Sequence, residues 1–548
     1  MMALGTKKIL PIGKDDFRMI QEAGNYYVDK SLMIKDWIEY GSLVTLITRP
    51  RRFGKTLNMT MLRDFFDITQ DSKAIFSGLA IMKTQHIERI NSTPVISLSL
   101  KGCTGDNTEA LKRSVATEVR KEYVKYAERF KEVDRTKDVY MQYFKTLEMF
   151  RGERLDEELL KNSLAYLVEA LYTFYNVRPI VLIDEYDNPI IEAHLMGFRK
   201  DFTSFYATFL TVVLKGNPFL GQAMLTGIQR VAKESIFSKL NNMVVYNVLD
   251  EHYAMYFGFT EGEAGQLLEH YDLELSEAVK RRYNGYYLSG IEIYNPWSIL
   301  SYANKKKLQN YWLKTSTNAL IKESVLTAGY DFHRSFEKLI KDGAVEVMLN
   351  LEASFAELPR TDTLWGLFVN AGYLTVIHED YDLNIFTVRI PNEEIKTEFQ
   401  EIVGAYTKLS SQLLKDMLTA LTRGQMDDFM DTYEKLVLQS TSYHDAKENA
   451  YHMLMLGMLM NLRDLYKITS NMESGYGRSD IIMESKDTGR PHIIIEFKQG
   501  ENVTELKQEA LKQIKDKEYY AGLQGEVLCI GLAHDKKVCQ LIHEIITI

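Results

Sequence analysis

The 548-residue sequence contains few of the residues that mark several common classes of protein. Its three cysteines, Cys103, Cys529 and Cys539, are too few and too scattered for a disulfide framework or a cysteine zinc site. The 10 prolines and 32 glycines form no linker, repeat or low-complexity block, so we expect domains that pack directly on one another. No apolar run approaches the roughly 18 residues that span a bilayer, and the N-terminus lacks the apolar stretch of a secretory signal. Both absences favour a cytoplasmic protein that does not enter a membrane.

Positive charge is not in excess either. The sequence has 66 lysines and arginines against 75 aspartates and glutamates, a net charge of −9. This balance excludes a protein that coats nucleic acid through bulk charge, but it leaves room for a local basic groove. The hydrophobic share of 45% and the charged share of 26% are ordinary for a folded soluble protein and exclude a disordered one.

Short β-like runs alternate with helical stretches through the first half of the sequence. The runs are largely apolar, which suits central strands of a parallel sheet covered by helices on both faces. The intervals between them are long enough for the helical crossovers that parallel strands require. We therefore predict an open α/β sheet within a domain of residues 1–255. The runs are Leu43–Thr48, Pro94–Leu100, Pro179–Asp184, Gly221–Thr226 and Val244–Val248.

Two further domains are predicted after the sheet. Residues 256–440 read as a helical connector of winged-helix-like character, with one hairpin formed by Leu374–His378 and Ile385–Ile390. Residues 441–548 read as a separate α/β unit. Its predicted elements are a helix at Asp445–Leu465, strands at Asp480–Met483, His492–Phe497 and Glu526–Leu532, and a charged helix at Glu505–Tyr520.

A phosphate-binding loop is indicated where the first strand runs through residues 49–56 (RPRRFGKT) into a helical pattern. A strand, a tight loop, Gly-Lys-Thr and a helix form the context of a P-loop, although a chance turn is the alternative. Gly54 would let backbone N–H groups approach a phosphate, Lys55 would neutralise it, and Thr56 would place a hydroxyl on Mg²⁺. Arg49 replaces the usual first glycine of the motif, so the start of this loop must be built differently.

An acidic pair at the end of the third run supports the P-loop interpretation. In P-loop ATPases an aspartate at this place holds Mg²⁺, and an acidic neighbour can polarise the attacking water. We assign these roles to Asp184 and Glu185, with two carboxylates at a solvated strand end as the alternative. Thr226 and Arg230, which follow the fourth run, are weaker candidates for orienting the water and sensing the γ-phosphate, and each could equally be structural.

The loop arginines leave two interpretations open. Arg49, Arg51 and Arg52 could engage phosphates or a neighbouring subunit, or they could form a solvated basic loop. The strand predicted at Pro94–Leu100 lies between the two motifs in the sequence, as in the additional-strand class of P-loop ATPases. The predicted nucleotide-binding residues are Arg52, Gly54, Lys55, Thr56, Asp184 and Thr226.

Two carboxylates and a lysine in the C-terminal unit have the spacing of a metal-dependent nuclease. Asp480 begins one strand, while Glu496 and Lys498 lie two apart on the next strand and so point to one face. Carboxylates suit Mg²⁺ that also binds water and phosphate oxygens, and the lysine could orient the water or stabilise the transition state. Upstream, Glu448 could complete the metal shell, and Gln513 lies on the following helix.

The alternative is an amphipathic hairpin in which Glu496 and Lys498 pair across a solvated surface. Three isoleucines directly precede these two charges, and charge is costly there unless it has partners. The helix that follows carries several lysines, a local positive charge that the whole-chain balance hides. They are Lys507, Lys512, Lys515 and Lys517.

At this point the sequence resembles a known family. The segments TRPRRFGKTLNMTML and PIVLIDEYDNPI, with the strings at residues 25–30, 294–298 and 473–480, are similar to the bacterial AAA-ATPase-like proteins. In that family a divergent P-loop ATPase is fused to a C-terminal PD-(D/E)XK nuclease domain. The resemblance implies an additional-strand parallel sheet, a helical or winged-helix-like connector and a restriction-endonuclease-like α/β domain.

The resemblance also implies residue roles. It gives nucleotide roles to Lys55, Thr56, Asp184 and Glu185, and nuclease roles to Glu448, Asp480, Glu496, Lys498 and Gln513. The proline of the nuclease family's name is absent, since Ser479 precedes Asp480.

The leading hypothesis is an ATP-binding and ATP-hydrolysing protein whose nucleotide state gates a nuclease. The expected cofactors are ATP and Mg²⁺, with Mn²⁺ as an alternative at the nuclease site. The expected partner is nucleic acid, DNA rather than RNA, and the chain is a candidate for self-association. One alternative is a nucleotide-dependent switch or scaffold whose nuclease-like domain binds nucleic acid without cleaving it. Another is a nuclease with a degenerate ATPase.

Overall fold

The computed structural model divides the chain into two compact units. The first comprises Met1–Phe332 and Ala344–Ile395, and the second comprises His333–Gly343 and Lys396–Ile548. The structure describes residues 7–152, 154–230, 242–312, 330–352, 360–380, 382–396, 411–440, 465–474, 477–487, 489–535 and 538–548, and the single residues 321, 324, 328, 399, 455, 458, 459 and 462. No helix within these ranges is long and apolar enough to cross a membrane.

Five parallel strands form the main sheet of the first unit, in the order β2-β3-β4-β1-β5. β1 and β3 are buried along their whole length, as expected for central strands covered on both faces. The prediction of an open α/β sheet is confirmed, and every predicted run lies within two residues of an observed strand. The strands are β1 (Val44–Thr48), β2 (Val95–Ser99), β3 (Ile180–Asp184), β4 (Gln222–Gly227) and β5 (Met243–Tyr246).

The position of β4 defines the class of the sheet. β4 pairs with both β1 and β3, so it separates the strand before the phosphate loop from the strand that ends in the acidic pair. This is the additional-strand arrangement of P-loop ATPases. The strand at Pro94–Leu100, which lies between the two motifs in the sequence, is instead β2 beyond β3.

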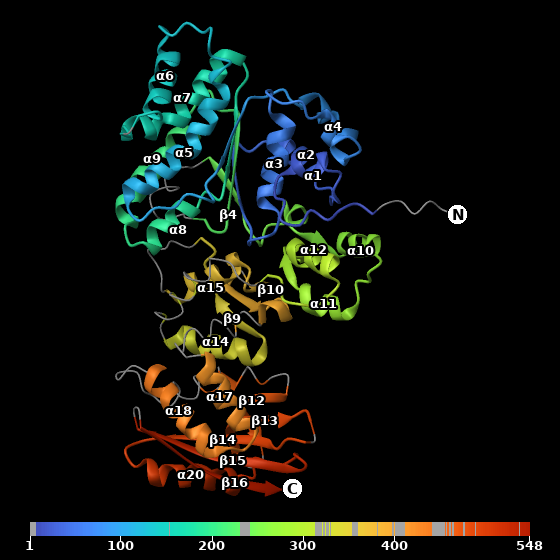
Figure 1. The fold of residues 1–548 in the computed structure, drawn as a ribbon, viewed down its shortest axis with the longest axis vertical. Helices are drawn as coiled ribbons and strands as arrows, with labels where there is room; N and C mark the ends of the chain where they lie inside the picture. The colour runs from blue at the N-terminus through green and yellow to red at the C-terminus, as the bar shows by residue number, and fades with distance from the viewer. Residues whose placement is uncertain are drawn as a thin grey trace, which may run out of the picture. The chain divides into compact units, whose positions relative to one another are not determined.

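Helices cover both faces of this sheet (Figure 1), with α1–α4 on one side and α5–α9 on the other. Local signals set several boundaries: the Asp156 side chain accepts the first free N–H groups of α7, and Asn176 ends that helix in the left-handed conformation. The helices are α1 (Phe17–Glu22), α2 (Leu32–Tyr40), α3 (Lys55–Phe66), α4 (Lys73–Phe76), α5 (Thr108–Ala127), α6 (Asp138–Met149), α7 (Glu157–Tyr175), α8 (Asn188–Leu195) and α9 (Arg199–Leu214).

The connector begins with a small α/β layer that the sequence pattern did not reveal. Three strands of two to four residues form an antiparallel sheet, and runs this short carry no readable alternation. Its core packs against Tyr26 and Val28 from the N-terminal segment. The elements are β6 (Phe259–Thr260), α10 (Glu261–His270), α11 (Glu277–Tyr283), β7 (Tyr286–Leu288), β8 (Ile291–Tyr294) and α12 (Pro296–Lys305).

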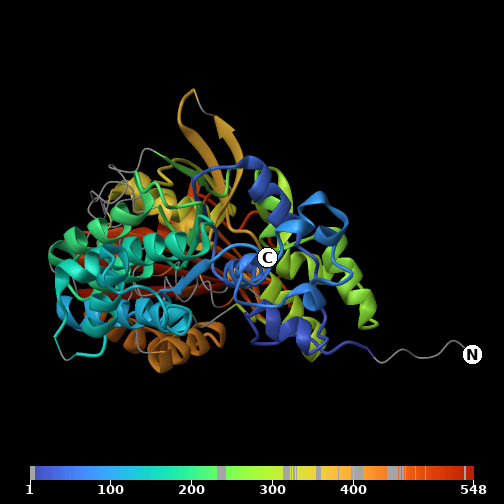
Figure 2. The same ribbon diagram turned by 90° about the horizontal axis from the view of Figure 1, so that it is seen from above.

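Residues 330–389 of the connector follow the order helix, strand, helix and hairpin, as along the chain of a winged helix. β11 lies between β10 and β9 and is antiparallel to both, and Figure 2 shows the β10–β11 hairpin extending outward. From Thr363 to Ala371 α15 is buried, so this helix is used for packing and is not free to enter a DNA groove. The elements are α14 (Tyr330–Asp342), β9 (Ala344–Met348), α15 (Thr361–Ala371), β10 (Thr375–Asp380) and β11 (Ile385–Arg389).

The second unit is built on a five-stranded sheet in the order β12-β13-β14-β15-β16. β14 and β15 are parallel and are joined by α20, while the other pairs are antiparallel. The predicted strands and charged helix are confirmed, and the edge strands β12 and β16 are additional. The elements are α17 (Ser411–Thr422), α18 (Met426–Ser440), β12 (Tyr466–Ser474), β13 (Gly477–Ser485), β14 (His492–Gln499), α20 (Val503–Asp516), β15 (Glu526–Asp535) and β16 (Val538–Thr547).

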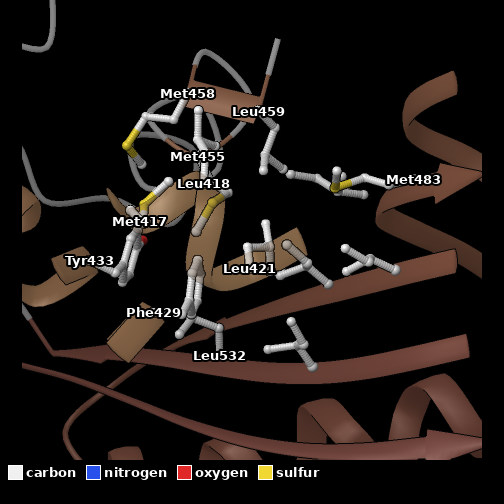
Figure 3. Packing of buried hydrophobic residues seen from close by; sticks show 14 of the residues in the cluster. Met417, Leu418, Leu421, Phe429, Tyr433, Met455, Met458, Leu459, Met483 and Leu532 are labelled. Atoms are coloured by element: carbon white, nitrogen blue, oxygen red, sulfur yellow. The ribbon is translucent and has the colours of Figure 1, made fainter. Parts of the chain in front are cut away.

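Both faces of this second sheet are covered. On one face α17 and α18 contribute residues such as Met417 and Phe429 to a cluster with Met483 and Leu532 (Figure 3). On the other face Ile514 of α20 packs with residues of β13, β14 and β15. The helix predicted at Asp445–Leu465 falls mostly outside the described residues.

Candidate nucleotide and nuclease sites

The phosphate loop turns through two residues with left-handed backbone. Arg52 has φ 67° and Gly54 has φ 87°, and α3 begins at the next residue, Lys55. Glycine adopts this conformation without a steric penalty, which explains Gly54, whereas arginine at such a φ indicates a backbone fixed by its surroundings. The sequence therefore forms the predicted strand, loop and helix, with the N-terminus of α3 directly after the loop.

Asp184, at the end of β3, links the start of α3 to the end of β4. Its Oδ2 accepts a hydrogen bond from the Thr56 hydroxyl at 2.6 Å, and its Oδ1 accepts one from the Thr226 hydroxyl at 2.5 Å. The carboxylate is 4% exposed. Three of the predicted nucleotide residues, separated by up to 170 positions in the chain, therefore meet at one carboxylate.

Lys55 folds back on its own loop. Its buried ammonium donates to the backbone carbonyls of Arg49 and Pro50, both at 2.9 Å. Burial lowers the pKa of Lys55, and the nearby carboxylates of Glu185 and Asp184 oppose that shift. The cation is thus held at the loop by neutral carbonyls, which a negatively charged phosphate oxygen could replace.

Glu185 faces a cavity of about 540 Å³ that also contacts Gly54, Lys55 and Thr56. Its φ of 52° turns the chain sharply at the end of β3. Asp184 therefore bonds to Thr56 and Thr226, while Glu185 lines the cavity. Burial raises the pKa of Glu185, and Lys55 opposes that rise. A carboxylate with a raised pKa beside a lysine and an open cavity is a suitable general base.

Two further residues, Asp187 and Asn188, follow β3 at the same end of the sheet. Asp187 is buried and accepts N–H groups from Ile228 at 2.8 Å and Gln229 at 2.9 Å, so it fixes the chain after β4. The Asn188 amide donates to three carbonyls, including Leu100 at 3.0 Å, and Asn188 lines the cavity beside Glu185. Neither residue is among those predicted for the site, although both follow the Asp-Glu pair within three positions.

Arg49 is neither a phosphate ligand nor a solvated charge in this structure. Its guanidinium is fully buried and donates to the carbonyls of Tyr246 at 3.1 Å and Asn247 at 2.5 Å. It also lies over the Phe257 ring. Burial lowers its pKa to about 10. The start of the loop is therefore tied to the chain after β5, in place of the usual glycine turn.

The other candidate arginines have different surroundings. Arg52 lines the cavity, and its guanidinium donates to the carbonyls of Tyr311 at 2.9 Å and Trp312 at 3.2 Å. Arg51 also lines the cavity. Arg230 pairs with Glu352 and is not among the residues that line this cavity.

The second site is assembled by strand register. β13 pairs with β14 so that Ile481 faces Ile495, which brings Asp480 and Glu496 side by side. The Asp480 N–H donates to the Glu496 carboxylate at 3.2 Å, and Asp480 accepts the Phe497 N–H at 2.7 Å. The predicted pair of carboxylates therefore shares one end of the hairpin.

Lys498 and Gln513 join the same carboxylate. The Lys498 ammonium lies 3.5 Å from Glu496, and the Gln513 amide donates to Glu496 from α20. The same amide donates to the Tyr519 hydroxyl at 2.9 Å. Tyr519 is buried, and the sequence analysis gave it no role. The surface-pair alternative does not hold for Glu496, because this carboxylate is only 2% exposed.

The charges at this site suit a divalent cation. Burial raises the pKa of Glu496 to about 7, and Asp480 adds to the rise while Lys498 opposes it. A buried carboxylate that resists ionisation beside a second carboxylate is an oxygen donor set for Mg²⁺. Among the described residues no group of three or more His, Cys, Asp or Glu is placed to hold a metal, and Glu448 lies outside them.

Comparisons with known proteins match a domain family over each of the two regions. Residues 446–544 match the model of the PD-(D/E)XK nuclease superfamily, and residues 11–237 match a family described as a predicted AAA-ATPase. An uncharacterised protein in the vnfD 5′ region of Azotobacter chroococcum mcd 1 is 26% identical over 402 residues, which cover 72% of this chain and 70% of that protein.

Among solved structures, a Walker-type ATPase of Pyrococcus abyssi is similar to 67% of this chain over 93% of its own, with a TM-score of 0.35 and 15% identity. The chain thus combines a domain of the predicted AAA-ATPase family with a domain of the PD-(D/E)XK nuclease superfamily.

Proposed function

We propose that the chain binds and hydrolyses ATP, and that its nucleotide state gates a Mg²⁺-dependent nuclease site that cleaves DNA in preference to RNA. The observation that carries the proposal is that one chain assembles both sites. Asp184 joins Thr56 and Thr226 beside the phosphate loop, and Glu496 joins Asp480 and Gln513 on the second sheet.

The cavity beside the phosphate loop has the chemistry that a nucleoside triphosphate requires. Lys55, Arg51 and Arg52 supply positive charge for phosphates, and the N-terminus of α3 favours an anion. Apolar walls from Ile12 and Trp297 suit a base. The size of about 540 Å³ lies within the usual range for small-molecule sites.

The residues at this site divide the hydrolytic work. Lys55 exchanges the carbonyls of its own loop for phosphate oxygens, and Glu185 takes the proton of the attacking water. Thr56 and Asp184 are the oxygen donors that would hold Mg²⁺. The metal would supply charge neutralisation for the phosphates.

At the nuclease site Asp480 and Glu496 would hold a divalent cation, Mg²⁺ or Mn²⁺, which would supply charge stabilisation at the reacting phosphate. Lys498 places a positive charge beside that pair and orients the water. Gln513 holds Glu496 in place from α20, so that the carboxylate keeps its direction when it ionises.

Contacts behind the phosphate loop support the gating part of the proposal. Gly372 of the connector lies so close to the loop that an added Cβ would stand 2.8 Å from Pro50. The Phe53 ring packs edge-on against Tyr286, with 4.9 Å between the ring centroids. A change in loop conformation on nucleotide binding would therefore reach the connector, which precedes the nuclease domain in the chain.

The test is cleavage of single- and double-stranded DNA and RNA by the full chain with Mg²⁺, with and without ATP. We expect wild-type cleavage to respond to ATP, Lys55→Ala to lose that response, and Asp480→Ala to lose cleavage. Unchanged cleavage by Asp480→Ala would contradict the nuclease assignment. Cleavage by Lys55→Ala that equals the wild type would contradict gating, and nucleic-acid binding without any cleavage would favour the scaffold alternative.

A further inference from the structure

Arg52 connects the phosphate loop to a segment far away in the sequence. Its guanidinium donates to the backbone carbonyls of Tyr311 and Trp312, and it stacks over the Trp297 ring at 4.8 Å from the centroid. We call Tyr311–Trp312 the strap. A loop residue with left-handed backbone and three such contacts is held in a defined conformation.

A buried carboxylate holds the strap from the other side. Glu394 is 1% exposed and accepts the backbone N–H of Trp312 at 2.8 Å, the N–H of Tyr311, and the Ser298 hydroxyl at 2.7 Å. Ser298 lies on α12, next to Trp297. The strap is therefore bound through its carbonyls to Arg52 and, at Tyr311, also to the Trp297 ring N–H at 2.9 Å, and through its amides to Glu394.

The same arginine is within the nucleotide cavity. Arg52, Lys55 and Trp297 all line it, so a ligand that fills the cavity meets the guanidinium and the ring that it covers. Hydrogen bonds from a guanidinium to phosphate oxygens are roughly twice as strong as bonds between neutral groups, and they are often bidentate. A bound triphosphate would thus compete directly with the two strap carbonyls for Arg52.

We propose that Arg52 is a nucleotide-operated switch: it bonds the strap when the cavity is empty, and it exchanges the strap for phosphate oxygens when a nucleoside triphosphate binds. The strap then keeps its bonds to Glu394 and the bond from the Trp297 ring N–H to the Tyr311 carbonyl, but it loses both guanidinium bonds. This inference rests on the proposed nucleotide binding and adds how that site signals its occupancy to the connector. Of the interpretations left open for the loop arginines, the proposal keeps phosphate binding for Arg52 and adds a contact within the chain in the empty state.

The test is amide hydrogen exchange of the full chain at Tyr311 and Trp312, with and without a non-hydrolysable ATP analogue and Mg²⁺. In the wild type we expect the analogue to speed exchange at both amides on the order of tenfold. In Arg52→Met, which keeps an apolar stem over Trp297 but loses the donors, exchange should be fast already and should not respond. Lys101→Met removes another cation from the cavity wall, one that pairs with Asp15, so it is the matched control and should respond like the wild type.

Nucleotide binding is measured separately with a fluorescent analogue, so that two failures can be told apart. If the wild type binds the analogue and exchange at Tyr311 and Trp312 stays the same or slows, the switch is wrong while the nucleotide site stands. If Arg52→Met exchanges like the empty wild type, the strap does not depend on Arg52 and the switch is again wrong. If no variant and not even the wild type binds nucleotide, both proposals fall.

Discussion

The two sites bury neighbouring carboxylates in opposite ways. Asp184 receives two neutral hydroxyls, from Thr56 and Thr226, and the nearby Lys55 is occupied by backbone carbonyls. Glu496 instead stands beside the carboxylate of Asp480, and burial together with that neighbour raises its pKa to about 7. Asp184 is thus stabilised by neutral hydrogen-bond donors, whereas Glu496 carries an electrostatic cost that a bound cation would lower.

This difference separates what each site needs for activity. At the nucleotide site Lys55 and Arg52 donate to backbone carbonyls, so a ligand must displace existing bonds to reach these two cations. At the nuclease site two carboxylates lie together at one end of a hairpin, so a bound positive charge would lower the electrostatic cost of the pair. Substitutions at the first site should therefore change how a ligand displaces existing hydrogen bonds. Substitutions at the second site should change the charge that a cation balances.

The largest effect is expected from Asp480. Asp480→Asn keeps an acceptor for the Phe497 N–H but halves the negative charge of the pair, so Mg²⁺ should bind poorly and cleavage should fall below detection. Cleavage of labelled oligonucleotides over a Mg²⁺ titration measures this. Nucleotide binding by the same variant is the control and should equal that of the wild type. Cleavage retained at wild-type Mg²⁺ concentrations would show that Asp480 is not a metal ligand.

Glu185 should separate binding from turnover. Glu185→Gln keeps the size of the side chain at the cavity wall but cannot take a proton, so ATP hydrolysis should fall by about 10²- to 10⁴-fold while binding persists. Because burial raises the pKa of Glu185, wild-type hydrolysis should increase as pH rises through that pKa. Phosphate release and fluorescent-nucleotide titration measure the two properties. Equal turnover by the variant and the wild type would show that Glu185 is not the general base.

Local sequence patterns predicted the parts of the structure that depend on neighbouring residues. Apolar runs located the five strands of the first sheet, and Gly54-Lys55-Thr56 located the start of α3. The period of two along a strand placed Glu496 and Lys498 on one face, and the sheet register then supplied Asp480. These features need only a few consecutive residues, and parallel or antiparallel pairing brings their strand ends together.

Contacts between distant segments were not predictable in the same way. Two of the carbonyls that bind Arg49 lie 197 and 198 positions away, and those that bind Arg52 lie 259 and 260 positions away. Every residue has a backbone carbonyl, so the sequence motif does not show which carbonyl an arginine binds. For the same reason the sequence left both arginines between a phosphate-binding and a solvated role.

The charge cost at Glu496 should appear as a pH dependence of stability in the absence of metal. Since the folded pKa of about 7 lies above the ordinary value of 4.5, the folded state binds more protons between those values, and stability falls as pH rises through that window. The shift corresponds to about 3 kcal/mol. Denaturant unfolding of the full chain in EDTA at pH 5 and pH 8 measures it.

Glu496→Gln removes the titrating group, so this variant should lose that pH-dependent fall and should be more stable than the wild type at pH 8. Glu501→Gln, at an exposed position two residues after β14, is the control for loss of one carboxylate. A wild type and a Glu496→Gln variant with the same pH dependence would contradict the proposed cost. Added Mg²⁺ should stabilise the wild type more than the variant, since only the wild type keeps both ligands.

The smallest effect on stability is expected at Gly227, a substitution that tests how closely the residues of the nucleotide site are packed. A Cβ at this position would lie 2.8 Å from the Asp187 carboxylate and 2.8 Å from the Tyr186 ring, the two residues that follow Asp184 and Glu185. Gly227→Ala should therefore destabilise the chain by about 1–3 kcal/mol, and it should weaken nucleotide binding because the end of β3 must shift. Gly262 in α10 has open space around its Cβ, so Gly262→Ala should stabilise the chain by about 0.4–1 kcal/mol and leave nucleotide binding unchanged. The hydrogen bonds of Asp184 and Asp187 imply that the ends of β3 and β4 are rigid. If both substitutions had the same effect on denaturant unfolding and on nucleotide affinity, this rigidity would be contradicted.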